Sequence, residues 1–165
     1  MGEDGWRVMC MGRETERLGY LCNTLALSLT HAGVDPTLDE QAICAGLLTL
    51  FNRNITSAPP LATQHTLPAL LAQLVQDRHN PDSLASVAQA LRGYLAQLAG
   101  CDDPDQDTLA RSVPDPGTWS VSQPHIQRAL PESLKACGQT LWQLSDAIRA
   151  RYFMHIRDIE QSLGF

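Results

Sequence analysis

The chain has 165 residues, of which 44% are hydrophobic and only 5% aromatic, and its formal net charge is −6. A chain of this length can bury about 70% of the surface of its unfolded state, so it can form a core without disulfides or metal ions. Abundant Leu and Ala with few aromatic residues favour helices over strands. The negative charge argues against a nucleic-acid-binding protein, which needs basic side chains for the phosphates.

The cysteines and the N-terminus indicate a reducing compartment. The five cysteines are Cys10, Cys22, Cys44, Cys101 and Cys137. Their odd number, their long spacings and the absence of a C-x-x-C motif predict reduced, buried thiols rather than disulfides. The acidic first residues do not resemble a signal peptide, and no apolar run approaches the ~20 residues that span a bilayer. We therefore expect a cytoplasmic protein without a membrane segment.

The first predicted helix covers about residues 5–30. One stripe of apolar side chains recurs along it at helical spacing: Leu18, Leu21, Cys22, Leu25 and Leu29. Projection at 100° per residue places a second set on the opposite face: Trp6, Met9, Arg13, Glu16 and Tyr20. Gly12 and Gly19 interrupt this helix and indicate close packing of a neighbour. A helix with two such faces usually lies between neighbours, so we expect the other helices to pack around it.

The remaining predicted helices follow in order, separated by Pro- and Gly-containing segments. The second opens at residues 35–40 and ends near Phe51, and the third covers residues 66–76. Asn80 is predicted to cap the fourth helix, which Gly100 ends. A short helix at residues 104–112 precedes an irregular connection at about residues 113–124. The last helix begins near Pro131, or somewhat before it, at His125.

These patterns predict an all-α fold class, a helical bundle of five or six helices with no sheet, in a single domain over residues 1–165. The motifs of common catalytic sites are absent: there is no nucleophile elbow, no Walker loop and no dinucleotide-binding glycine motif. The five histidines are scattered, and the acidic run at residues 101–107 lacks the Gly and Glu of an EF-hand. We predict a solvated turn or a helix N-terminus there, no metal site and no cofactor.

Two polar groups remain as candidate sites. Arg13 and Glu16 lie three residues apart on the first helix, beside Arg17, and share a face with aromatic residues. We expect these three side chains to be partly buried against the last helix, with Asp146 as the best partner for an Arg. A surface ion pair is the alternative interpretation.

The second polar group lies at the end of the last helix. Arg151 and His155 share a helical face, and two cations so placed could hold a carboxylate or a phosphate. A purely structural network of ion pairs is the alternative.

Three motifs resemble those of the alpha-E domain family, bacterial helical proteins of unestablished activity. GWR at residues 5–7 and GRETER at residues 12–17 resemble that family's GWR…GRxxER helix. NPDSLA at residues 80–85 is similar to its NPxSLA helix start, and LSDAI at 144–148 with RYFMH at 151–155 is similar to its closing LSDAIxxRYFxH. The order and spacing of the three together carry the resemblance.

The resemblance implies only the C-terminal half of the usual family domain. It departs at residues 51–57, where the family carries an acidic and Ser-containing segment running into Thr-Tyr-Arg. Family members are encoded with, or fused to, circularly permuted ATP-grasp ligases and transglutaminase-like proteins. The resemblance thus implies a role in ATP-dependent amide or peptide-bond chemistry. Together with the missing catalytic motifs, it leads us to expect a non-catalytic domain that supports or docks an ATP-grasp ligase or a transglutaminase-like partner. The alternative is an enzyme or a small-ligand or anion binder that uses Arg13, Glu16, Arg17, Asp146, Arg151 and His155 in an inter-helix cleft.

Overall fold

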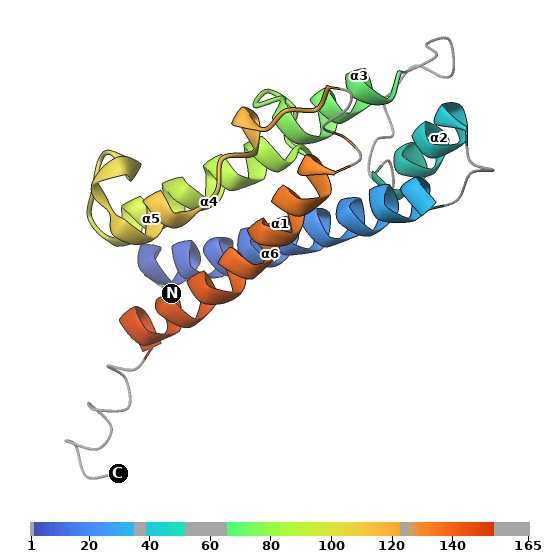
Figure 1. Cartoon of the computed structure of the whole chain (residues 1–165). Helices are drawn as coiled ribbons and strands as arrows, with labels where there is room; N and C mark the ends of the chain where they lie inside the picture. The colour runs from blue at the N-terminus through green and yellow to red at the C-terminus, as the bar shows by residue number, and fades with distance from the viewer. Residues whose placement is uncertain (1, 35–38, 52–65, 123–125, 127, 154–165) are drawn as a thin grey trace.

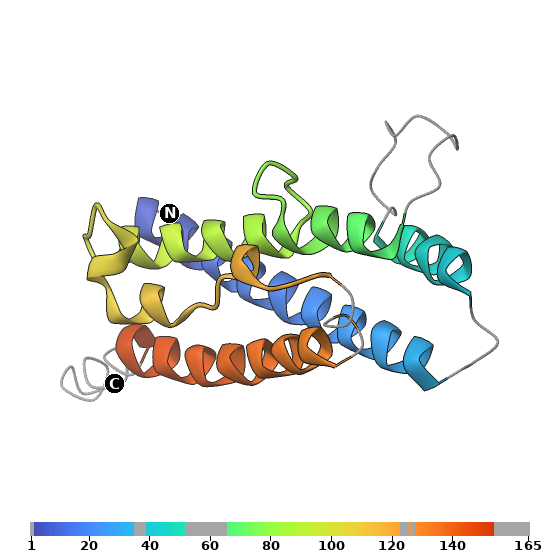
Figure 2. The ribbon, with the colours of Figure 1, turned by 45° about the horizontal axis from the view of Figure 1, so that its top comes forward.

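The computed structural model describes residues 2–34, 39–51, 66–122, 126 and 128–153, which contain six α-helices and no strand (Figure 1). The prediction of an all-α fold is therefore confirmed. The longest helix is α1, Glu3–Val34, and α4, Leu84–Leu98, and α6, Ala129–Ile148, both pack along it. Figure 2 shows α1 in blue running obliquely to α4 in green and α6 in orange.

Shorter elements connect and extend these three helices. The 12-residue α2 packs against α1 and α3 near the C-terminal end of α1, and α5 lies against both α4 and α6. The bounds of the shorter helices are α2 Glu40–Phe51, α3 Leu67–Leu71, π-helix η2 Ala72–Gln76, 3₁₀-helix η3 Pro104–Gln106, α5 Thr108–Ser112, 3₁₀-helix η4 Pro116–Thr118 and π-helix η6 Arg149–Phe153. The helix predicted at residues 66–76 is thus α3 continued by η2. The helix predicted at residues 104–112 is divided into η3 and α5.

Side-chain caps set several of the helix starts. Ser83 accepts a hydrogen bond from the backbone N–H of Ser86 at 3.1 Å, so α4 begins at Leu84. The prediction that Asn80 caps this helix was wrong, because the chain makes one further turn before α4 starts. Gly100 ends α4 as expected, with a φ of +70° that an L-residue adopts only at a cost.

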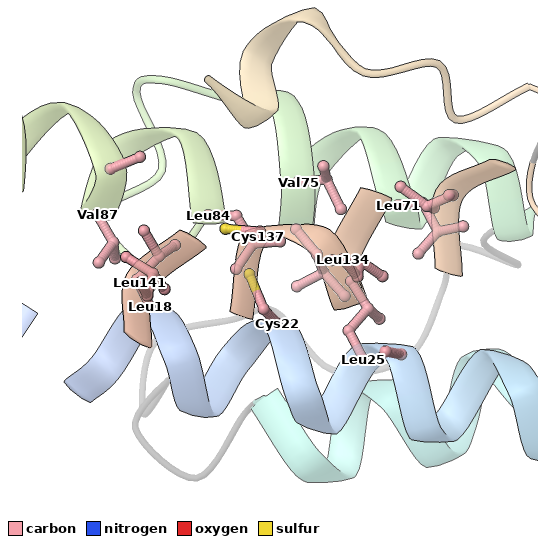
Figure 3. Close-up of a cluster of buried hydrophobic side chains, with 14 of the residues drawn as sticks. Leu18, Cys22, Leu25, Leu71, Val75, Leu84, Val87, Leu134, Cys137 and Leu141 are labelled. Carbon is pink, nitrogen blue, oxygen red and sulfur yellow. The ribbon is translucent and has the colours of Figure 1, made fainter. Parts of the chain in front are cut away.

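The core forms where the apolar stripe of α1 meets α4, α6 and the η2 segment. Figure 3 shows Leu18, Cys22 and Leu25 of α1 facing Leu134, Cys137 and Leu141 of α6, with Leu71, Val75, Leu84 and Val87 closing the other side. All ten side chains are buried, which confirms the predicted stripe.

The cysteines that the structure assigns as free thiols include Cys10, Cys22, Cys101 and Cys137, in agreement with the prediction of reduced side chains. Two of them meet in the core. A hydrogen bond to Cys137 raises the pKa of the Cys22 thiol, which keeps its proton, and the same bond lowers the pKa of Cys137.

The second face of α1 is not packed inside the bundle. Trp6, Met9 and Tyr20 are 60%, 55% and 65% exposed. The expectation that neighbours cover both faces of α1 was wrong, because α4 and α6 flank its Leu-rich stripe and leave the opposite face to solvent. None of the helices in the described ranges combines the length and the hydropathy needed to cross a bilayer.

Two helix-interior glycines give a test of this packing. A Cβ added at Gly12 of α1 or Gly138 of α6 meets no heavy atom within 4 Å, whereas one added at Gly19 lies 3.9 Å from Leu141 Cδ1. Because Ala is a better helix former than Gly, Gly12→Ala and Gly138→Ala should each raise the free energy of unfolding by about 0.5–1 kcal/mol in denaturant melts.

Gly100→Ala is the matched control, and it should lower the free energy of unfolding by about 1 kcal/mol because of the positive φ. Loss of stability in Gly12→Ala would mean that the space beside α1 is occupied.

Candidate functional site

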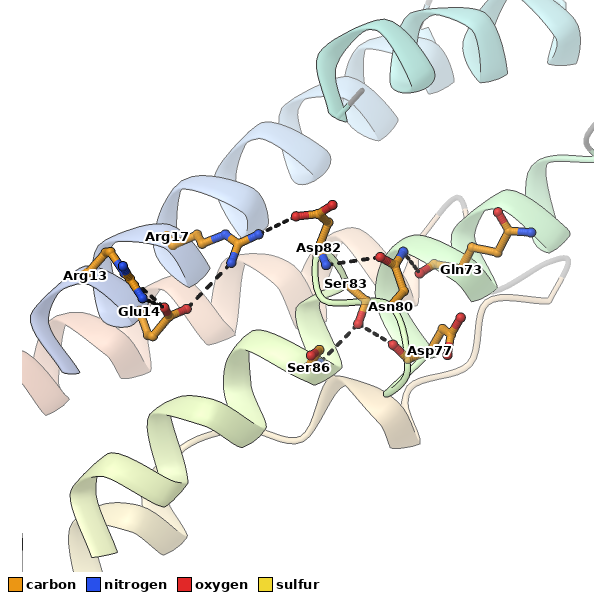
Figure 4. A network of polar contacts seen from close by, with 9 residues as sticks. All are labelled: Arg13, Glu14, Arg17, Gln73, Asp77, Asn80, Asp82, Ser83 and Ser86. Atoms are coloured by element: carbon orange, nitrogen blue, oxygen red, sulfur yellow. Dashed lines mark hydrogen bonds and ion pairs between the residues drawn. The ribbon is translucent and has the colours of Figure 1, made fainter. Parts of the chain in front are cut away.

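Arg17 joins α1 to the turn that precedes α4. Its Nη2 donates to Asp82 Oδ1 at 2.6 Å, and its Nη1 lies 3.8 Å from Glu14 Oε2 (Figure 4). Arg13 Nη2 lies 3.1 Å from the other oxygen of Glu14. Glu14 is only 5% exposed, so its charge is compensated almost entirely by these two guanidinium groups. The four side chains form an ionic link between two of the sequence motifs.

Sequence reasoning missed Glu14 and Asp82. A signal for Glu14 existed: it lies three residues after Met11 and four before Leu18, both of which are buried, so helical spacing alone puts its side chain beside the core. Tyr94 of α4 lies nearby. A hydrogen bond with Cys10, burial and the negative charge of Glu14 raise the pKa of Tyr94.

The turn at residues 77–83 fixes the position of Asp82. Asn80 Nδ2 donates to the carbonyl of Gln73 at 3.1 Å, and Asn80 Oδ1 accepts from the backbone N–H of Asp82 at 3.1 Å (Figure 4). Ser83 Oγ donates to the carbonyl of Asp77. The NPDSLA motif therefore presents Asp82 to Arg17 and begins α4, which is a structural role.

A second ionic link holds η6, the last helical segment that the structure describes, to α5. Arg151 Nη1 donates to Asp107 Oδ1 at 2.7 Å, and Asp107 Oδ2 accepts from the backbone N–H of Ala110 as the cap of α5. The acidic run, predicted as a solvated turn or a helix N-terminus, is both: Asp102, Asp103 and Asp105 are exposed, and the buried Asp107 caps α5. Arg151 thus binds a carboxylate of its own chain, and His155 lies outside the described residues.

The predicted contact between the α1 cluster and Asp146 was wrong. Arg13, Glu16 and Asp146 are exposed, and Arg17 pairs with Asp82 instead. The reason is geometric: α6 packs against the Leu-rich stripe of α1, so the polar side chains that flank this contact turn outward. Of the five predicted site residues that the structure describes, Arg17 and Arg151 bind different carboxylates, so these five do not gather in one cleft.

A groove between α1 and α6 is the main hollow near these motifs. Its larger part encloses about 490 Å³, and a second hollow of about 310 Å³ extends it toward Gly19 and Trp142. The two parts share Thr15, Glu16, Ser145 and Arg149. The larger part is lined by Val8, Met11, Gly12, Thr15, Glu16, Ser145, Ile148, Arg149 and Phe153. Six of the nine come from the GRETER, LSDAI and RYFMH motifs.

The groove combines an apolar floor with walls of opposite charge. Met11 and Ile148 are buried beneath it, Glu16 lies on the α1 wall and Arg149 on the α6 wall. Within the described part of the chain neither Glu16 nor Arg149 belongs to an ion pair. Thr15 Oγ1 already donates to the Met11 carbonyl at 2.8 Å. Such a surface can bind an apolar segment that carries both charges.

The residues that the structure describes contain no group of three His, Cys, Asp or Glu side chains placed to hold a metal ion.

A family model for a predicted alpha-helical domain with a conserved ER motif, Alpha-E, matches residues 1–153. The chain belongs to the Alpha-E family. No curated protein and no solved structure matches it. The match starts at residue 1 and covers most of the chain, so the expectation of only a C-terminal half of the family domain was wrong. Residues 52–57, most of the segment where a departure from the family was expected, lie outside the described residues.

The structure gives the two residues of an ER pair different roles in this Alpha-E chain. The dipeptide Glu-Arg occurs once in the sequence, at residues 16 and 17. Arg17 turns toward α4 and pairs with Asp82, whereas Glu16 lies in the groove beside α6. One residue therefore holds the helices together, and the other faces the candidate site.

Substitution of the two glutamates separates these roles. Glu14→Ala should lower the free energy of unfolding by about 2 kcal/mol, because it removes a buried, charge-assisted interaction with Arg13 and Arg17. Glu16→Ala, at an exposed position, should change it by no more than about 0.5 kcal/mol. Urea melts of both variants measure the difference, and equal losses would contradict the assignment.

The Asp107–Arg151 link should make stability depend on pH. Burial raises the pKa of Asp107. Hydrogen bonds from Arg151 and from the backbone N–H groups of Ala110 and Leu109, together with the Arg151 charge, lower this pKa by more than burial raises it, so the net pKa is below its ordinary value. A carboxyl whose pKa is lowered in the folded state stabilises the fold fully when the pH is above its pKa in the unfolded state, about 3.9. This stabilisation is lost as the pH falls through the pKa of the folded state.

The free-energy gap between the wild type and Asp107→Asn should therefore be widest near neutral pH and shrink below about pH 4. Denaturant melts between neutral and acidic pH measure it. Asp105→Asn is the control, because Asp105 is exposed and should show a small gap. If the free-energy gap between the wild type and Asp107→Asn did not change with pH, the Asp107–Arg151 ion pair would not be its cause.

Proposed function

We propose that this Alpha-E domain is a non-catalytic helical domain that supports or docks an ATP-grasp-type amide or peptide ligase, through the groove between α1 and α6. The observation that carries the proposal is the exposed aromatic side chain at each end of that groove. Trp142 lines one end and is 75% exposed, and Phe153 lines the other. Large apolar side chains around a hollow are typical of protein interaction surfaces, where Trp contributes strongly to binding.

The charges of the motifs support a scaffold role. Arg17 is paired with Asp82, and Arg151 with Asp107, so these motif cations join helices of the same chain. The alternative function, an anion or small-ligand site built from the Arg, Glu and Asp cluster, has less support for the same reason. What remains on the outer surface is the groove, its aromatic ends and the Glu16 and Arg149 walls.

The type of ligase follows from the family resemblance, which associates such domains with ATP-grasp and transglutaminase-like proteins. A domain with a three-helix core and an open groove on its surface can hold a partner without taking part in its chemistry. The partner would then supply ATP binding and bond formation, and this domain would supply position.

Binding to the ATP-grasp ligase from the same source tests this proposal. Trp142→Ala should weaken the affinity, measured by titration calorimetry, by about tenfold or more, which is typical for loss of an interface Trp. Leu27→Ala is the matched control: Leu27 is 61% exposed on α1 but does not line the groove, so its affinity should stay near that of the wild type. Failure of the wild-type domain to bind the ligase, or equal weakening by both variants, would contradict the proposal.

A further inference from the structure

We infer that the segment occupying the α1–α6 groove is an amphipathic α-helix of the partner, with a basic side chain toward Glu16 and an acidic one toward Arg149. The inference rests on the proposed function and names the chemistry of its partner. Four properties of the groove lead to it: its length, the backbone of its walls, its charges and its apolar ends.

The groove has the length of a short helix. Its α1 wall runs from Val8 to Gly19, which at 1.5 Å per residue is about 16 Å, or three helical turns. The two hollows are continuous because they share four lining residues. An apolar stripe at positions i, i+3, i+4 and i+7 of a docked helix spans about 11 Å, so it fits within this length.

The walls require an occupant that satisfies its own backbone. Both walls are helical, so their backbone donors and acceptors are used within α1, α6 and η6, and no strand edge lines the groove. An extended peptide on this apolar floor would leave N–H and C=O groups without partners, which is costly. The backbone N–H and C=O groups of a helix are hydrogen-bonded within the helix, and only its side chains face outward. A helix can therefore lie on the apolar floor without unsatisfied backbone groups.

The charges set the polarity of the occupant. Glu16 and Arg149 lie on opposite walls, and within the described residues neither is neutralised by an ion pair. A helix whose apolar face lies on the floor carries flanking side chains on both edges, and opposite charges there fix orientation, as in coiled coils. The net charge of −6 disfavours a second copy of the chain as the occupant, because two such copies repel.

The ends of the groove suit apolar anchors. Gly138 near the Trp142 end, and Gly12 within the α1 wall, leave open space beside their helices, so large side chains of a docked helix can enter there without displacing a Cβ. Trp142 and Phe153 then pack against the two ends of the docked helix. This arrangement would add a third helix to the α1–α6 pair and cover the outer surface that the bundle leaves exposed.

Charge reversal tests the inference on the intact domain. Glu16→Lys and Arg149→Glu should each weaken binding of the ATP-grasp ligase by about tenfold at low salt. The controls make the same charge changes outside the groove: Glu132→Lys at the start of α6 and Arg111→Glu in α5, both exposed, should alter the affinity by less than about twofold. Urea melts of all four variants establish that each is folded.

A photo-cross-linking residue at Ser145 then identifies the bound segment of the ligase by mass spectrometry. The expected product joins Ser145 to a ligase helix with apolar residues at helical spacing, and reversing the basic residue on its edge should restore binding to Glu16→Lys.

The failures are distinguishable. A wild-type domain that does not bind the ligase overturns the proposed function and this inference with it. Normal binding by both groove reversals, or a cross-link to a loop, a strand or a second copy of the domain, overturns only the inference.

Discussion

The burial of one apolar stripe on α1 organises the protein. Leu18, Cys22 and Leu25 are fully buried, and they contact α4 and η2 on one side and α6 on the other. Each Leu buried in this way contributes about 1.5–3 kcal/mol relative to an exposed one. Both α4 and α6 pack against this stripe. The direction in which any other side chain of α1 points is therefore set by its angular position around the helix axis relative to the stripe.

The ionic links work within this constraint. Glu14 lies at the edge of the stripe, where its carboxylate is removed from water, and Arg13 and Arg17 compensate its charge. Arg17 then reaches Asp82 at the start of α4, and Arg151 reaches Asp107 at the start of α5. In each case an Arg, from α1 or from η6, pairs with an Asp at or just before a helix start, so the pairs fix the helices in register as well as neutralising charge.

The same constraint leaves a groove along the edge of the α1–α6 contact, above the buried Met11 and Ile148. Thr15 and Glu16 of α1 line one wall of this groove, and side chains of α6 and η6 line the other. Gly12 and Gly138 have no side chain that could fill the space beside their helices. The exposed aromatic residues and the walls of opposite charge therefore follow from the way in which α6 crosses α1. A partner helix there would complete the packing that this chain begins.

Periodicity alone predicted the all-α fold, the core stripe of α1, the presence of α4 and the range of the helix at residues 66–76, because helical spacing of Leu and Ala is a local property of the sequence. The resemblance to the Alpha-E family came from three sequence motifs, which are local as well. The burial of Glu14 was within reach of periodicity, because the spacing of Glu14 from Met11 and Leu18 is fixed by the helix itself. Periodicity could not predict the partners of the charged residues. Arg17 pairs with Asp82, 65 residues away, and Arg151 pairs with Asp107, 44 residues away, because separate helices pack together. Glu16 and Arg17 are adjacent in sequence, yet one lies in the groove and the other on the α4 side, because successive residues of a helix point about 100° apart and only the tertiary structure decides which neighbour lies in each direction.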